Sequence, residues 1–141
     1  MAPKALVTGA SRGIGKACAQ YLARAGFDVA ISARTVQPGE AREHSSTVKW
    51  SDTTPLPGSL EETAALVEGE GREAMIVVAD LLDPASLGAA AATILERWGV
   101  VDVVVHNGRY IGPGHMDRFL DTPIELIEKQ IYANAIAPLV L

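Results

Sequence analysis

The sequence is poor in the features on which disulfide-bonded, metal-binding and membrane proteins depend. Its single cysteine, Cys18, cannot form a disulfide within the chain, and with only three histidines no structural zinc site is expected. No apolar run approaches the roughly 18 residues of a membrane-spanning helix. Residues 1–15 also lack the apolar core of a secretory signal peptide. We therefore expect a cytoplasmic protein with a reduced cysteine, no metal and no membrane partner.

Positive charge is also scarce. Lysine and arginine number 12 against 17 aspartates and glutamates, a formal net charge of −5. Nucleic acids and anionic membranes bind basic surfaces, so neither is expected as a partner. What the chain does have is a globular composition, with 48% apolar and 21% charged residues in 141 positions. This suits one domain over residues 1–141 with a single substantial core.

Four short apolar segments predict buried strands, at residues 4–8, 28–33, 74–79 and 101–106. Each precedes a segment with helical features, so the order of elements is βαβαβαβα. Strands that are apolar throughout are typical of parallel sheets covered by helices on both faces. Right-handed connections then give the strand order 3-2-1-4, an α/β doubly wound, Rossmann-like fold that we expect to be incomplete at the C-terminus.

Apolar periodicity and stop signals define the first and third helices. Gly26 ends the first helix, whose expected apolar face is Ile14, Cys18, Tyr21, Leu22 and Ala25. In the third helix Asp83 is the expected cap, Pro84 takes the first helical position and Gly99 closes the helix. Its apolar stripe is Leu87, Ala90, Ala91, Ile94, Leu95 and Trp98.

Capping boxes predict the second and fourth helices. Ser59 and Glu62 match the S-x-x-E pattern at the start of a helix that reaches about residue 69. Thr122 and Glu125 match it again, with Pro123 at the first position of a helix that runs to the chain end.

Residues 36–58 show neither helical nor strand periodicity and carry three prolines, Pro38, Pro55 and Pro57. We interpret this segment as a long loop or insertion. Loops of this length are uncommon in compact domains unless they are functional or mobile.

A glycine-rich turn, GASRGIG at residues 9–15, lies between the first strand and its helix. Such a turn directs backbone N–H groups and the positive end of the helix dipole at one point, which favours a phosphate. Gly13 and Gly15 would let a diphosphate and the neighbouring strand come close to the backbone. A Walker A loop is excluded, because five residues separate Gly9 from Gly15 and Ala17 stands where the magnesium-binding hydroxyl would be. A tight turn without a ligand is the simpler alternative.

The segment TGASRGIG at residues 8–15 resembles the cofactor loop of the short-chain dehydrogenase/reductase family. Asp80 matches the family's adenine-contacting aspartate, Asn107 lies where the family has its N-N-A-G signature, and Asn134 matches its catalytic asparagine. The resemblance covers the chain except residues 36–58. It implies cofactor contacts at Gly9, Ser11, Arg12, Gly13, Ile14, Gly15, Arg34, Thr35, Asp80, Leu81, Asn107 and Gly108.

The chain departs from the family pattern after the fourth strand, where it reads His106-Asn107-Gly108-Arg109. Arg109 puts a large cation where the family has glycine. It is either an exposed loop residue or a residue with a role near a substrate or phosphate. His106 is interpreted as a strand-end residue, since the sequence places no carboxylate or second histidine near it.

The choice of nicotinamide cofactor depends on the end of the second strand. An acidic residue there would favour NAD, but the strand ends in Arg34, and the nearest acid, Asp28, is at the strand's start. In the family, the position of Arg12 faces the same 2′ group of the adenosine. Because arginines pair well with phosphate oxygens, NADP is expected rather than NAD. If Arg34 is only a solvated strand-end residue, the preference stays open.

The family's catalytic Y-x-x-x-K motif is missing from these residues, as is its serine strand. The residues four positions after Tyr21, Tyr110 and Tyr132 are Ala25, Gly114 and Ile136. We therefore expect a cofactor-binding front portion, truncated before the catalytic residues and unable to turn over carbonyl compounds alone. The complete form would transfer hydride between NADP(H) and a small carbonyl/alcohol substrate and form a homo-oligomer. Alternatives are a non-catalytic dinucleotide-binding or interaction module, or an inert gene product.

The last helix has one further feature. Spacing places Ile127, Ile131 and Asn134 on one inward face, and Pro138 has no N–H to bond the carbonyl of Asn134. We expect a kink that either presents this carbonyl to a water or polar partner or only fits the helix to its neighbours.

Overall fold

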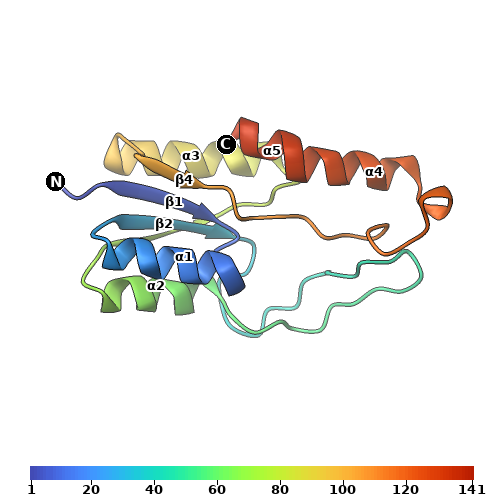
Figure 1. Cartoon of the computed structure of the whole chain (residues 1–141), viewed down its shortest axis with the longest axis horizontal. Helices are drawn as coiled ribbons and strands as arrows, with labels where there is room; N and C mark the ends of the chain where they lie inside the picture. Colours follow the sequence, from blue (N-terminus) through green and yellow to red (C-terminus); the bar gives the residue numbers. More distant parts are fainter.

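The computed structural model describes residues 1–141 and contains one parallel sheet of four strands in the order β3-β2-β1-β4 (Figure 1). The strands are β1 (Lys4–Thr8), β2 (Asp28–Ala33), β3 (Ala74–Val78) and β4 (Val103–Val105). The predicted doubly wound α/β fold with strand order 3-2-1-4 is confirmed. β4 is shorter than the expected 101–106; just before it, the exposed Asp102 carboxylate accepts the N–H of Lys4 at 2.7 Å.

Helices cover both faces of the sheet (Figure 1). On one face lie α1 (Gly13–Arg24) and α2 (Leu60–Gly69). On the other lie α3 (Pro84–Trp98) and α5 (Ala137–Val140). α5 ends a helical run that begins with α4 (Ile124–Ile131), which extends beyond the strands, and continues through a π turn (Tyr132–Ile136) (Figure 1). A short 3-10 turn (Phe119–Asp121) precedes α4. None of these helices has the length and apolar character of a transmembrane span.

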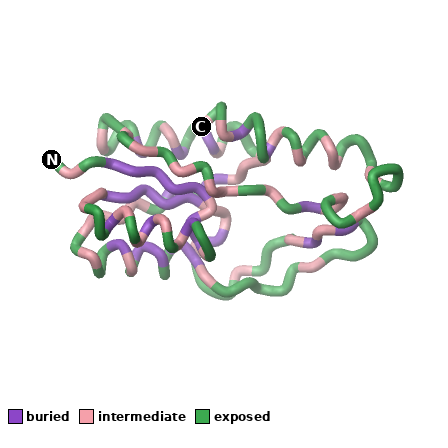
Figure 2. Tube along the Cα trace, in the orientation of Figure 1, coloured by how far each residue is buried: buried purple, intermediate pink, exposed green.

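Successive side chains along the two central strands, β1 and β2, point to opposite faces of the sheet, so the core has two layers. Val7 and Ile31, which are register partners, pack under α1 and α2, whereas the partners Leu6 and Ala30 pack under α3 and α5. Figure 2 shows β1 and β2 as the most buried part of the chain. Because both faces of these strands are covered, their continuous apolar sequence is explained.

The predicted apolar face of α1 is wrong. Ile14 and Tyr21 are 74% and 65% exposed, and Ala25 is exposed as well. The buried face consists of Gly15, Ala19 and Ala23, with Cys18 and Leu22 partly buried beside it. Small side chains let the helix axis approach the sheet closely, and this close approach turns the larger apolar residues outward.

The stripe predicted for α3 is correct at its centre and wrong at its margin. Leu87, Ala90 and Ile94 are buried, but Leu95 is 52% exposed. A helix on one face of a sheet buries a narrow strip, so residues at the edge of a broad apolar stripe stay in solvent.

Two of the predicted helix caps are present and one is not. The Ser59 hydroxyl accepts the N–H of Glu62 at 3.1 Å, and the Asp83 carboxylate accepts the N–H of Ala85 at 3.0 Å. The capping box at Thr122 is absent, because the Thr122 hydroxyl instead donates to the Arg118 carbonyl at 3.0 Å and closes the 3-10 turn. Pro123, in extended conformation, takes the cap position of α4.

The last helix departs from regular α geometry just before Pro138, in the region where the sequence predicts a kink. The departure is a π turn over Tyr132–Ile136. The inward face differs from the prediction, however. Ala133 and Ala137 are buried, whereas Ile131 is 56% exposed and Asn134 is exposed.

β2 and α2 are joined by residues 34–59, which contain no helix or strand. Within this connection, residues 36–58 run beyond the carboxyl ends of the strands and lie beside the loop between β4 and α4 (Figure 1). The two segments are joined by the Met116 N–H, which donates to the Ser46 carbonyl at 2.9 Å, and by Asp117. The Asp117 carboxylate accepts the Thr47 hydroxyl at 2.6 Å and the Val48 N–H at 2.8 Å. The segment is therefore held at its far end as well as at the sheet.

Candidate functional site

The glycine-rich turn joins the carboxyl end of β1 to the start of α1. Gly9 and Gly13 have positive φ values of 65° and 55°, a conformation that favours glycine. A Cβ at Gly13 would meet nothing within 4 Å, so the turn is open to a ligand there. Arg12, the cap residue of α1, makes no side-chain cap bond, which leaves N–H groups at the helix start available for an anion.

Asn107 and Gly108, which follow β4, fasten this turn to the sheet. The Asn107 amide donates to the carbonyls of Thr8 and Gly9, both at 3.2 Å. The Gly108 N–H donates to the Thr8 hydroxyl at 2.9 Å. Gly15 is needed for the same packing, since a Cβ there would overlap the Gly9 carbonyl and lie 2.5 Å from the Asn107 amide nitrogen.

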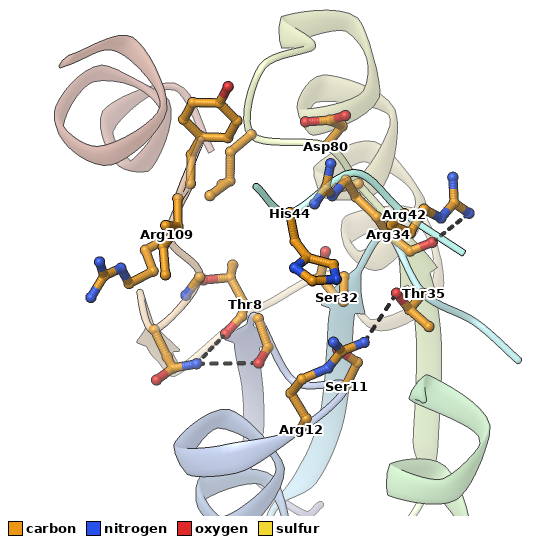
Figure 3. A pocket seen from close by; sticks show the side chains of 18 of the residues that line it. Thr8, Ser11, Arg12, Ser32, Arg34, Thr35, Arg42, His44, Asp80 and Arg109 are labelled. Carbon is orange, nitrogen blue, oxygen red and sulfur yellow. Dashed lines mark hydrogen bonds between the residues drawn. The ribbon is translucent and has the colours of Figure 1, made fainter. Parts of the chain in front are cut away.

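A cleft of about 400 Å³ opens at the carboxyl ends of the strands, beside the turn (Figure 3). This is where ligands bind in doubly wound folds. Ten of the residues predicted to contact a cofactor line it: Gly9, Ser11, Arg12, Ile14, Arg34, Thr35, Asp80, Leu81, Asn107 and Gly108. Gly13 and Gly15 belong to the adjoining turn and do not line the cleft.

Arg12 and Arg34 give the β2 side of the cleft a positive character. Arg12 Nη2 donates to the Thr35 hydroxyl at 3.3 Å, while Arg12 Nε is buried without a hydrogen-bond partner (Figure 3). Burial, followed by the charge of Arg34, lowers the pKa of Arg12. Two guanidinium groups with an unsatisfied buried donor are suited to an anionic ligand.

Asp28, the acid nearest to Arg34 along β2, faces the opposite end of the strand. Its carboxylate binds Lys4 Nζ at 2.5 Å and Arg72 Nη2 at 2.6 Å, and the Asp28 side chain is 9% exposed. It therefore supports the sheet and does not contribute to the cleft.

Asp80 lies at the end of β3 on the far side of the cleft from the glycine turn (Figure 3). One of its carboxylate oxygens accepts the Leu82 N–H at 2.9 Å, and the Asp80 N–H donates to the Ser86 hydroxyl at 2.9 Å. These bonds fix the side chain at the mouth of the cleft next to Leu81.

Asn134 does not line the cleft. Its amide instead binds both backbone polar atoms of Tyr110, which does line it. In this structure Asn134 therefore positions the loop after β4. Burial raises the pKa of Tyr110, so its hydroxyl is protonated at neutral pH.

The sequence interpretation missed a group of cleft residues that come from the segment 36–58. These are Glu40, Arg42, His44, Thr54 and Leu56. Nothing in their spacing marks them, because an irregular segment has no periodicity from which a face can be inferred. Arg109 also lines the cleft, and Figure 3 shows its side chain directed away from Arg12, Arg34 and Arg42.

Comparisons with known proteins agree with this architecture. Residues 3–54 match the family model for short chain dehydrogenase. Hydroxysteroid dehydrogenase-like protein 2 of Xenopus tropicalis is 31% identical over 128 residues, which cover 91% of this chain and 27% of that protein.

Two solved structures are similar over nearly the whole chain. An alcohol dehydrogenase from Thermococcus sibiricus, complexed with 5-hydroxy-NADP, superposes with a TM-score of 0.73 at 30% identity, over 98% of this chain and 49% of that one. A 3-oxoacyl-[acyl-carrier protein] reductase from Brucella melitensis in complex with NAD has a TM-score of 0.74 at 25% identity, over 99% of this chain and 46% of that one.

The chain thus spans about half the length of these structures and about a quarter of the curated relative. One of these structures holds an NADP derivative and the other holds NAD. Both therefore bind a nicotinamide nucleotide, but they differ in which one they hold. With the glycine turn, the strand order and the cleft at the strand ends, these matches support the identification of the chain as a fragment of the short-chain dehydrogenase/reductase family.

Proposed function

We propose that this chain binds NADP(H) in preference to NAD(H) and that the complete protein transfers hydride between NADP(H) and a small carbonyl/alcohol substrate. The observation that carries the cofactor preference is the pair Arg12 and Arg34, on the cleft side of β2, which itself ends without an acidic residue. The nearest carboxylate, that of Glu40, is already bonded to Arg42 and to the N–H groups of Val36 and Gln37. A 2′-phosphate would gain charge-assisted hydrogen bonds from the two arginines, and the 2′-hydroxyl of NAD would lack the acidic acceptor that usually ends the strand.

The residues present fit a dinucleotide. The open backbone at Gly13 and the uncapped start of α1 suit the diphosphate, and the unpartnered Nε of Arg12 suits an anion next to it. Following the family resemblance, Asp80 and Leu81 would bound the adenine. Asn107 and Gly108 would hold the glycine turn in its binding shape through their bonds to Thr8 and Gly9.

When bound, a nicotinamide cofactor supplies or accepts the hydride. The residues of this chain bind and orient that cofactor, and Asn134 positions the loop after β4 through Tyr110. The proton donor or acceptor for the substrate oxygen would come from elsewhere in the complete protein, since no Y-x-x-x-K motif is present in these residues. We also propose a homo-oligomer for the complete form and, from the single cysteine, a cytoplasmic location.

Titration calorimetry with NADPH and NADH tests the proposal. We expect the unaltered chain to bind NADPH at least tenfold more tightly, because each lost or repelled phosphate contact is worth on the order of 1–3 kcal/mol. Arg34→Asp should reverse the preference by removing a donor and adding a negative charge. Arg97→Asp, on the exposed part of α3 and outside the cleft, is the control and should leave the preference unchanged. Equal affinities of the unaltered chain for the two cofactors would contradict the proposal.

A further inference from the structure

The outer part of the segment 36–58, residues 43–57, borders the cleft and reaches across to the loop between β4 and α4 (Figure 1). We call residues 43–57 the strap. We propose that the strap closes over a bound cofactor and that Asp117, in the opposite loop, is the latch whose opening governs the rates of cofactor entry and release. The inference rests on the proposed function in one respect, that a nicotinamide dinucleotide occupies the cleft.

The strap lies where the cofactor has to pass. Three of its residues line the cleft, namely His44, Thr54 and Leu56. Figure 3 shows the His44 ring between Arg12 and Asp80. In the proposed function these two residues bound the adenosine part of the cofactor, so the strap must cover that part or move aside for it.

The strap is attached to the rest of the chain at one place. Every hydrogen bond that joins residues 43–57 to the rest of the chain goes to Met116 or Asp117. One is the bond from the Met116 N–H to the Ser46 carbonyl, and the other two are accepted by the Asp117 carboxylate. Apolar burial adds little, since the largest apolar side chain of the strap, Trp50, is 65% exposed. A segment held by so few contacts opens at low cost while the core stays folded.

Bonds within the strap keep its two sides together. The Glu43 carboxylate accepts the N–H groups of Ser45 at 2.8 Å and Asp52 at 3.1 Å. The Ser45 hydroxyl donates to the Trp50 carbonyl at 2.6 Å, and the His44 N–H donates to the Asp52 carbonyl at 3.0 Å. Because these bonds do not involve the rest of the chain, the strap can move as one body when the latch opens.

The ends of the segment 36–58 are fixed, which confines the motion to the strap. On the β2 side, the Glu40 carboxylate accepts the N–H groups of Val36 at 3.0 Å and Gln37 at 2.7 Å. On the α2 side, the backbone of Gly58 lies against the glycine turn, where a Cβ would be 2.5 Å from the Ser11 carbonyl oxygen. The strap is therefore held at both ends and at its latch, and only the latch joins it to the opposite wall of the cleft.

Asp117 forms the stronger part of the latch. Its carboxylate accepts the Thr47 hydroxyl at 2.6 Å and the Val48 N–H at 2.8 Å, and the Gly114 N–H at 3.0 Å fixes it in its own loop. The bond from Thr47, followed by those from the two N–H groups, lowers the pKa of Asp117, so the carboxylate is ionised at neutral pH. Hydrogen bonds to an ionised acceptor are stronger than those between neutral groups.

The latch is separate from the surface that contacts the ligand. Neither Asp117 nor its partners Thr47, Val48 and Gly114 line the cleft, so their bonds can form whether the cleft is empty or occupied. An interaction that is equal in the two states cannot change the affinity for the ligand. It changes the fraction of time for which the strap is open, and therefore changes the rates of entry and release by the same factor.

Stopped-flow fluorescence of NADPH measures both rates, association by mixing NADPH with the chain and dissociation by displacing bound NADPH with excess NADP⁺. For Asp117→Ala we expect both rate constants to rise on the order of tenfold, with the dissociation constant from titration calorimetry unchanged. Asp117→Asn, which keeps an oxygen acceptor but loses the charge, should raise both rates less. Thr47→Val, which removes the donor on the strap side, should also raise both.

Asp121→Ala is the control, because it removes a nearby exposed carboxylate that lies 3.7 Å from Arg118 and makes no bond to the strap. It should leave both rates unchanged. If Asp117→Ala speeds dissociation alone and weakens binding, Asp117 supports the bound state only, which overturns its role as a latch. Unchanged rates in both Asp117→Ala and Thr47→Val overturn that role as well.

The same measurements with NADH, displaced by NAD⁺, separate this inference from the proposed cofactor preference. The latch bonds lie outside the cleft, so Asp117→Ala should speed the exchange of NADH by the same factor. If the unaltered chain binds both cofactors equally and the variant speeds both, the preference is overturned and the latch stands. If the unaltered chain prefers NADPH and the variant changes no rate, the preference stands and the latch is overturned. A chain that binds neither dinucleotide overturns both.

Discussion

The side chain of Asn134 binds both backbone polar atoms of Tyr110. Asn134 Oδ1 accepts the Tyr110 N–H at 2.8 Å, and Asn134 Nδ2 donates to the Tyr110 carbonyl at 3.0 Å. Asn134 lies in the π turn of the last helix, and Tyr110 lies in the loop after β4 that borders the cleft. One amide therefore connects the helix on one face of the sheet to the rim of the candidate cofactor site.

Replacing Asn134 by alanine should lower the free energy of unfolding by about 1 kcal/mol, because it removes the two hydrogen bonds to Tyr110, together with one to Gln130, at an exposed position. Urea unfolding measures this change. The exposed neighbour Lys129→Ala serves as the control and should unfold at the same urea concentration as the unaltered chain. An Asn134→Ala midpoint equal to that of the control would show that these bonds add nothing to stability.

Two glycine-to-alanine changes should have opposite effects on stability. Gly15→Ala introduces a Cβ that would overlap the Gly9 carbonyl, and we expect it to cost about 1–3 kcal/mol. Gly88→Ala, on the exposed side of α3 with nothing within 4 Å of the added Cβ, should stabilise the chain by about 0.5–1 kcal/mol. Thermal unfolding of the two variants compares them directly. A stable Gly15→Ala variant would mean that α1 can move away from the turn without cost.

Asp28 should make stability depend on pH in the acid range. Burial alone would raise the pKa of Asp28, but hydrogen bonds from Lys4, the Glu73 N–H and Arg72 outweigh it and lower the pKa. A pKa lowered by folding contributes stability above the unfolded value of about 4, and this contribution is lost as the pH falls through the folded value.

Asp28→Asn should therefore cost about 3 kcal/mol at pH 7, because it leaves Lys4 and Arg72 without their charge partner. As the pH falls below about 4 and through the lowered pKa of folded Asp28, the gap in the free energy of unfolding should narrow, because Asp28 becomes protonated. Urea unfolding at several pH values tests both statements, with the exposed Glu68→Gln on α2 as the control. A gap that stays constant from pH 7 to pH 3 would contradict the charge-based explanation.

Asp117 should determine how firmly the segment 36–58 is held at its far end. Its carboxylate accepts bonds from Thr47, Val48 and Gly114, and these bonds together lower its pKa. Asp117→Ala should speed backbone hydrogen exchange in residues 44–52 while the strands stay protected. Asp121→Ala, which removes an exposed carboxylate 3.7 Å from Arg118, is the control. Unchanged exchange in the segment would show that the Met116–Ser46 bond alone holds it.

Features that depend on a few neighbouring residues could be predicted from the sequence. The strands, the Ser59 and Asp83 caps and the terminating glycines were predicted correctly, because cap chemistry and positive φ act over one turn of chain. The strand order followed as well, since right-handed connections leave few ways to arrange four parallel strands.

Features that depend on the distance between elements could not be predicted in this way. Apolar spacing placed Ile14 and Tyr21 in the core, but the close approach of α1 to the sheet buries Ala19 and Ala23 instead. The Thr122 hydroxyl, predicted to cap the last helix, instead donates to the nearby Arg118 carbonyl.

The sequence by itself determined that this chain forms a parallel α/β sheet with a glycine turn at its first strand, because periodicity and turn chemistry are local. Only the tertiary structure decided what surrounds that turn. It directed Asn134 to Tyr110, and it brought Arg42 from an irregular segment to Arg34. These contacts join residues from different elements or from a segment without periodicity. No local sequence pattern therefore predicts them.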